Sequence, residues 1–334
     1  MIDFKYHLVS IIAVFLALAV GLVVGATALS GPALAILQKA EKQVNRNNQA
    51  LFKKNQALQN QVSADQLFGS AAAPRLLPGL LADEKVVLVL APGSVGTVST
   101  GLTTALRQAG ATVTGTVTLN GSFLDTTVAN EARLKELAQT LAQSADVKLP
   151  AVLTGHVGAQ QAAAQVLAAS LLTKNPPGLP SAESHAILSG LSQNNYITVS
   201  SGLSSPAQLA VLVTPGGAPP QNGNQDGSQV LVATAVALQN AGLGTVMAGA
   251  VQSAGPNSVI SAENTPQQVS TVDNADTELG QIMTVQALRQ LLDRKPPGQF
   301  GIGPQAVPTP APTPSVTPTP APTPSTSART GGHK

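Results

Sequence analysis

The chain opens with an uninterrupted apolar segment, and this feature limits everything else that the chain can fold into. Between Leu8 and Leu29 the 22 residues carry no charge, and only Ser10 and Thr27 have polar side chains. A helix of about 20 apolar residues crosses the hydrocarbon core of a bilayer, and it satisfies its own backbone hydrogen bonds there. We therefore expect a chain that is tethered to a membrane or exported through one.

Two interpretations of this segment differ in whether it is retained. Its length, and the sparse positive charge before it (Lys5 and the α-amino group), favour an uncleaved transmembrane signal anchor over residues 1–30. The sequence Ala26-Thr27-Ala28 has the small-x-small form of a cleavage site. The alternative is therefore a protein secreted after cleavage near Ala28.

The charges that flank the segment bear on its orientation. Lys39, Lys42 and Arg46 follow it within 20 residues, and by charge alone they favour the cytoplasmic side. Long domains often translocate regardless of such charges. We expect a single-pass topology with the domain that follows on the extracytoplasmic side.

Residues 33–70 form the second expected region, a coiled-coil helix. Leu37, Val44, Leu51 and Leu58 recur every seven residues. If they occupy heptad position d, position a holds Leu34, Glu41, Asn48, Asn55 and Val62. Asn at a with Leu at d favours a parallel two-stranded coiled coil. The pattern predicts a homodimer or higher oligomer through the 33–68 helix, a stalk of roughly 50 Å; the alternative is one amphipathic helix lying on its own domain. We expect Pro74 to end this helix.

Residues 84–300 alternate between apolar runs and amphipathic stretches, which predicts an α/β domain with a doubly wound, mostly parallel sheet of the Rossmann-like kind. Gly110 is expected to follow the C-terminus of the first helix. Strands are expected at 86–91, 111–119, 152–154, 208–214 and 245–250. Helices are expected at 98–109, 131–145, 158–173, 181–193, 229–239 and 276–292, and a flexible surface loop at 215–227.

The last region, residues 301–334, is of low complexity. The octapeptide PTPAPTPS occurs at 308–315 and again at 318–325. Such a Pro/Thr-rich sequence is expected to be disordered or polyproline II, without a core. Tracts of this kind are typical of stalks and wall-spanning tails, which is consistent with an extracytoplasmic C-terminus.

Composition excludes several classes of function. The net charge is +2 with 10% charged residues and 2% aromatic residues, which does not fit a nucleic-acid binder. The absence of cysteine removes disulfides, thiolate metal sites and cysteine nucleophiles. We therefore expect membrane and envelope partners rather than nucleic acid.

Two short segments contain residue types that can form chemical sites. Residues 93–96 (Gly-Ser-Val-Gly) follow the first strand where a dinucleotide fold holds a pyrophosphate, but two glycines do not complete the fingerprint. Ser94 lacks the flanking pattern of a hydrolase nucleophile. The acidic segment 273–278 lacks the spacing of a calcium loop, and Asp273 or Asp276 is expected to cap the last helix instead.

Soft metal ligands are few and widely separated in the sequence. Copper sites favour Cys, Met and His, and His156, at the end of an expected strand, is the one candidate near a sheet edge. We predict no catalytic residues and a protein that is not an enzyme, and we assign no cofactor-binding or metal-binding residues. The histidines and methionines are His7, His156, His185, His333, Met1, Met247 and Met283.

Three segments resemble a known family. The N-terminal block MIDFKYHLVSIIAVFLALAVGLVVGA, the Asn/Gln/Leu-rich helix after it and STVDNADTELGQIMTVQALRQLL near the end are similar to the actinobacterial MctB-like copper-transport family. The resemblance covers about residues 1–300. It implies a membrane location and a role in copper homeostasis, with copper as ligand or cargo, and a channel-forming role has been proposed for the family.

Three functions follow as hypotheses. The first is a single-pass envelope protein of copper homeostasis whose α/β domain is a non-catalytic binding or assembly module. The second is a channel-forming component of the envelope, which one anchor cannot provide without oligomers or partner proteins. The third is a nucleotide-binding or enzymatic domain, for which no set of nucleophile, base and phosphate loop is present.

Overall fold

The computed structural model describes residues 4–149, 157–200, 203, 206–216, 227–251, 259–260, 268–303 and 306–307. The chain divides into two compact units, residues 1–65 and residues 66–334. The strand expected at 152–154, most of the loop at 215–227 and nearly all of the Pro/Thr-rich tail lie outside the described residues.

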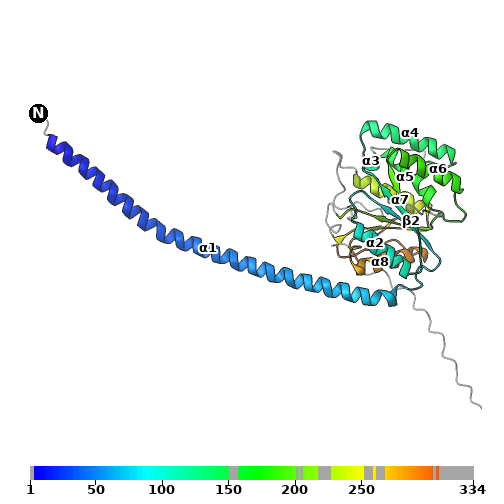
Figure 1. Ribbon diagram of the computed structural model, residues 1–334, viewed down its shortest axis with the longest axis horizontal. Coiled ribbons are helices and arrows are strands. Elements are labelled where there is room, and N and C mark those ends of the chain that lie inside the picture. The colour runs from blue at the N-terminus through cyan, green and yellow to red at the C-terminus, as the bar shows by residue number, and fades with distance from the viewer. Residues whose placement is uncertain are drawn as a thin grey trace, which may run out of the picture. The chain divides into compact units, whose positions relative to one another are not determined.

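The first unit is built on helix α1 (Phe4–Leu76), which Figure 1 shows in blue. Its segment Tyr6–Gly25 is long and apolar enough to cross a membrane, and its side chains are exposed to the surroundings. A cleaved signal sequence would give the same pattern, so the anchor and the secreted form both fit this helix.

The expected end of the helix at Pro74 is wrong. Helix α1 passes through Pro32 and Pro74 and ends at Leu76. Ala73 and Leu77 are buried in the core of the second unit, and the Leu77 N–H donates to the Ala73 carbonyl at 3.0 Å. A proline removes one N–H from the helix, and the burial on either side of Pro74 is sufficient to hold the last turn.

A seven-stranded sheet forms the centre of the second unit, in the order β3-β2-β1-β4-β5-β6-β7. All neighbouring strands are parallel except β3, which pairs antiparallel with β2 at one edge. The expected α/β class with a mostly parallel sheet is thereby confirmed. The strands are β1 (Lys85–Leu90), β2 (Thr112–Leu119), β3 (Ile197–Val199), β4 (Leu209–Val213), β5 (Gly244–Ala248), β6 (Ser270–Val272) and β7 (Gln299–Phe300).

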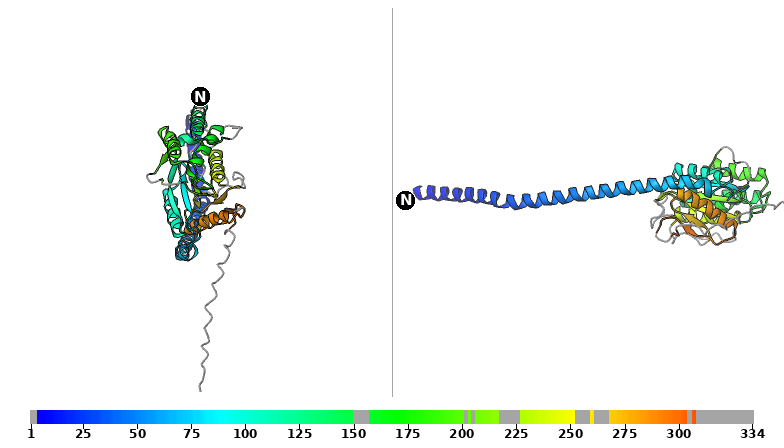
Figure 2. Two further views of the ribbon diagram at one scale, coloured as in Figure 1. Left: turned by 90° about the vertical axis from the view of Figure 1, so that its right-hand side faces the viewer. Right: turned by 90° about the horizontal axis from the view of Figure 1, so that it is seen from below.

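Helices cover both faces of this sheet (Figure 2), which is why β4 and β5 read as continuous apolar runs and are buried along their whole length. On one face, Val86 and Leu88 of β1 pack in a core with the end of α1, α2 and α8. On the other, Val87 and Val89 pack with α4, α5, α6 and α7. The helices are α2 (Gly96–Gln108), α3 (Gly121–Leu124), α4 (Val128–Ser144), α5 (Gly158–Leu171), α6 (Ser181–Gln193), α7 (Gly227–Ala241) and α8 (Glu278–Leu292).

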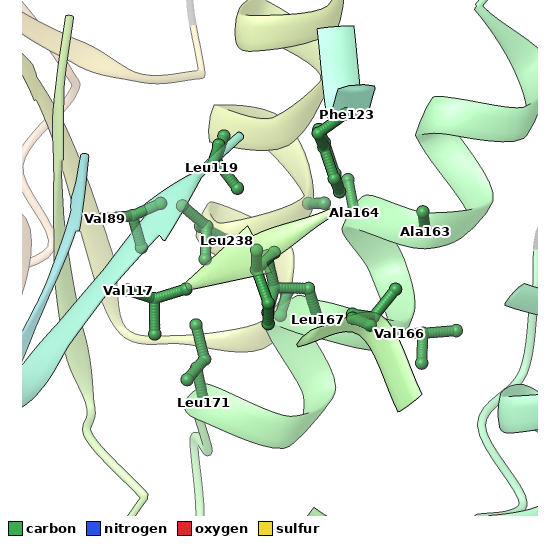
Figure 3. Close-up of a cluster of buried hydrophobic side chains, with 14 of the residues drawn as sticks. Val89, Val117, Leu119, Phe123, Ala163, Ala164, Val166, Leu167, Leu171 and Leu238 are labelled. Atoms are coloured by element: carbon green, nitrogen blue, oxygen red, sulfur yellow. The ribbon is translucent and has the colours of Figure 1, made fainter. Parts of the chain in front are cut away.

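Small side chains let the larger core form around helix α5. Figure 3 shows Val89 and Val117 from the sheet opposite Leu167 and Leu171 of α5, with Phe123 nearby. Alanines on α5 are buried among α4, α6 and α7, so the helices pack close together around it. Aliphatic and alanine side chains supply nearly all of this core.

Apart from the strand at 152–154, which lies outside the described residues, the helices and strands expected from 84 to 300 lie within about three residues of their predicted bounds. Gly110 takes φ +89° directly after the C-cap Ala109, as expected. Helix α4 buries Leu134, Ala138 and Leu141, the face that the periodicity predicted. The elements absent from the sequence-based prediction are short: α3, β3, β6 and β7.

Candidate functional site

The carboxyl ends of β1, β4, β5 and β6 meet at one edge of the sheet. The chain passes from β1 to β2 in one direction and from β4 to β5 in the other, so the order of strands reverses between β1 and β4. Ligands of open α/β sheets bind at this kind of position. The segments that follow these strands are therefore the first candidates for a site.

The segment after β1 is a tight turn into α2. Gly93 has φ +79°, and the Ser94 N–H donates to the Ala91 carbonyl at 3.1 Å. Val95 is the N-cap of α2 and provides no side-chain acceptor, and a Cβ at Gly96 would meet no atom within 4 Å. The two glycines serve a strand-to-helix turn, and no other group in the described residues completes a phosphate site beside them.

The acidic segment 273–278 joins three parts of this edge through backbone N–H groups. Asp273 is buried, and its Oδ1 and Oδ2 accept from the N–H groups of Ile302 and Gly303, both at 2.8 Å. Asp276 Oδ1 accepts from the Val251 N–H at 2.8 Å. These carboxylates tie the end of β6 to the segments that follow β5 and β7.

The prediction that Asp273 or Asp276 caps the last helix is wrong, because Thr277 does. Thr277 is the N-cap of α8, and its Oγ1 accepts from the Gly280 N–H at 3.1 Å. The same hydroxyl donates to the Asn274 carbonyl at 2.8 Å. The two aspartates are already engaged with other backbone segments.

A second polar cluster lies at the carboxyl end of β2, and sequence reasoning missed it. Asn120 donates to the carbonyl and side-chain oxygens of Asn195, 75 residues away, both at 3.1 Å. The Tyr196 hydroxyl donates to Asn130 Oδ1 at 3.2 Å. No local spacing in the sequence relates these residues, because the antiparallel pairing of β3 with β2 brings them together.

The phenol of Tyr196, which belongs to this cluster, has a shifted pKa. Burial raises the pKa of Tyr196 above its ordinary value of 10.0; the charge of Arg133 lowers it and that of Asp125 raises it. The phenol is therefore neutral at physiological pH and acts as a hydrogen-bond donor.

The soft-ligand candidates lie apart from one another. Met247 is buried on β5 in one core, and Met283 is buried on α8 in the other, across the sheet. His7 is exposed on α1 and His185 is exposed on α6, whereas His156, His333 and Met1 fall outside the described residues. Within the described ranges no group of three His, Cys, Asp or Glu side chains lies close enough to hold a metal ion.

Two hollows lie on the helical face away from α2 and α8. One, of about 420 Å³, runs between α5 and α7 and is lined by amides such as Gln161, Gln165 and Gln229. The other, of about 480 Å³, is bordered by Pro177, Pro206 and His185 near α6. Neither hollow contains a set of residues with a recognisable chemical function.

The arrangement of side chains described above does not identify a family, whereas the comparison with known families does. Residues 1–310 match the family model described as "Copper transport outer membrane protein, MctB". The chain belongs to this family. The match extends from the apolar N-terminus through the end of the α/β sheet, so it covers both units of the MctB-type chain.

Curated relatives support the same assignment. The chain is 29% identical over 312 residues to proteins named copper transporter MctB from Mycobacterium tuberculosis and Mycobacterium bovis, covering 91% of this chain and 97% of theirs. The MctB protein of Mycobacterium leprae is 30% identical over 313 residues with the same coverage. The resemblance seen in the sequence is thereby confirmed.

Proposed function

We propose that this MctB family member is a single-pass envelope protein of copper homeostasis, and that its α/β domain is a non-catalytic binding or assembly module. The observation that carries the proposal is the family match over residues 1–310. The apolar helix segment Tyr6–Gly25 supports a membrane anchor, with secretion after cleavage near Ala28 as the alternative. We propose that the α/β domain lies on the extracytoplasmic side.

An apolar stripe on α1 supports pairing of two chains. Leu37, Leu51 and Leu58 are 69%, 58% and 50% exposed in the single chain, and Val44 and Val62 are 54% and 51% exposed. We define these five residues as the α1 seam. Side chains at such spacing are buried when a second helix packs along them, and we propose that a second copy of this chain does so.

Topology and copper binding are tested separately. Reporter fusions after residue 70 and at residue 334 should both report an extracytoplasmic location. N-terminal sequencing of the mature protein should find the N-terminus intact. A mature N-terminus near residue 29 would instead show that the signal is cleaved and that the protein is secreted. Isothermal titration of the full chain in detergent with Cu(I) and with Cu(II) tests direct contact with copper, and no heat with either ion would rule out a direct role.

A channel-forming component is the second candidate, because the family description names an outer membrane protein and the curated relatives are named transporters. One spanning helix cannot enclose a pore, so conduction would need several copies or a partner. Recordings in planar bilayers with verified insertion should show copper-dependent current if this holds. A silent bilayer would favour the binding or assembly role.

A further inference from the structure

The stalk segment of α1 carries a basic ridge on the side away from the α1 seam. We define the basic ridge as Lys39, Lys42, Arg46, Lys53 and Lys54, all of which are exposed. At about 100° per residue in a helix, the first four fall within about 60° of one another. The α1 seam lies on the opposite side of the helix from these four cations, and the fifth, Lys54, lies between them and the seam, about 40° from Leu58.

The net charge of the whole chain conceals this local concentration. Residues 36–64 hold five basic residues and one acid, Glu41, which gives 5 − 1 = +4, whereas the whole chain has 18 − 16 = +2. The rest of the chain therefore carries 2 − 4 = −2. Glu41 lies on the seam side, so no carboxylate of this segment interrupts the ridge.

Within the stalk segment, residues 36–64, the described side chains of the ridge form no ion pair. The salt bridge present among the described residues joins Arg289 to Asp293 on α8, at 2.8 Å. The five cations span 16 residues, from Lys39 to Lys54, which is about 22 Å of helix. Unpaired cations in a row favour an extended partner with repeated negative charge.

We propose that the basic ridge binds a linear acidic polysaccharide. Amide side chains flank the cations, such as Gln43, Gln49 and Asn60, and amides both donate to and accept from sugar hydroxyls. Single-stranded nucleic acid is bound largely through aromatic stacking, and Phe52, the aromatic residue within the ridge segment, lies away from the ridge on the helix. The chemistry of the face therefore matches a polymer with carboxylate charges and hydroxyl groups.

The membrane that α1 is proposed to cross lies too far away to be the partner. Lys39 is 10 residues beyond Leu29, the last residue of the uncharged run, which is about 15 Å along the helix. Charges at a bilayer surface are screened over about 8–10 Å at physiological ionic strength. The ridge thus lies in the aqueous space beyond the bilayer, where a soluble or wall-bound polymer can reach it.

The test uses the full chain in neutral detergent micelles and fluorescein-labelled sodium polygalacturonate, read by fluorescence anisotropy. We expect binding that weakens as salt rises, and a loss of affinity of at least about tenfold when the five cations become Gln (K39Q, K42Q, R46Q, K53Q and K54Q). Gln has nearly the helix propensity of Lys and Arg, so circular dichroism should be unchanged. Equal binding by this variant would overturn the proposal.

A matched control removes the same charge elsewhere. The variant with R75Q, R107Q, K135Q, K148Q and K174Q loses five exposed cations of the second unit and should bind the labelled polymer as the wild type does. An equal loss in this control would mean that net charge alone decides, and would contradict a ridge site. Tighter binding to phosphatidylglycerol vesicles or to duplex DNA than to polygalacturonate would also contradict it.

Discussion

Asp273 joins two segments of the second unit because both of its oxygens accept backbone N–H groups, from Ile302 and Gly303. The segment after β7 can approach Asp273 this closely because residue 301 is glycine. A Cβ there would clash with Asp273 Oδ1, and Gly301 has φ +133°. The conformation and the contact therefore both require glycine at this position.

Gly301→Ala should lower the free energy of unfolding of the second unit by about 2–3 kcal/mol, through the strained backbone and the displaced carboxylate. The control is Gly96→Ala at the start of α2, where a Cβ meets open space and a gain of about 0.4–1 kcal/mol is expected. Chemical denaturation monitored by circular dichroism measures both. A Gly301→Ala protein as stable as the control would refute this role of the turn.

Tyr196 should titrate above its ordinary pKa of 10.0, because burial disfavours its charged form. The chain has two tyrosines, so Tyr6→Phe leaves the absorbance of Tyr196 alone to be followed near 295 nm. The unfolded chain loses this proton at lower pH than the folded chain. Stability from this group is therefore fully present below pH 10 and is lost as the pH rises through the folded pKa. A midpoint at or below 10.0 would contradict the burial of the phenol.

The residue that caps helix α8 could not be predicted from the sequence. Thr277, Asp276 and Asp273 are all residue types that cap helices well, and nothing local ranks one above the others. The assignment depends on which carboxylate is already bound by Val251, Ile302 or Gly303, and these contacts join distant parts of the chain. The Asn120–Asn195 cluster was unpredictable for the same reason.

Among elements, the long and periodic ones could be predicted from sequence. Strand β4 and helix α4 show their periodicity over enough residues to be recognised. Strands β3, β6 and β7 have two or three residues each. They form because the backbone of a neighbouring strand provides their hydrogen-bond partners. Helix α1 likewise continues past Pro74 because Ala73 and Leu77 are buried.

At this same scale, the α1 seam makes a direct prediction about pairing. Leu51→Lys places a charge in the middle of the seam and should convert the proposed dimer to a monomer, since a desolvated, unpaired ammonium is costly. Ala57→Lys adds the same charge to an exposed position on the side of the helix away from the seam, and should leave the dimer intact. Sedimentation equilibrium of the full chain in density-matched detergent distinguishes them, and identical masses for the two variants would contradict pairing through the seam.

For the whole molecule, the sequence established the α/β class and the family resemblance, but no local geometry identifies a copper site in the described residues. The functional assignment depends on the match over residues 1–310 rather than on a constellation of side chains.

The most direct measurement is the copper content of a mycobacterial host that lacks its own MctB, determined by mass spectrometry after exposure to copper. Expression of this chain should restore the copper content of the parent strain, and the Leu51→Lys variant should restore it less. The Ala57→Lys variant serves as the matched control and should act as the unaltered chain does. A copper content equal to that of the empty-vector strain, with the chain verified in the envelope, would contradict the proposed role in copper homeostasis.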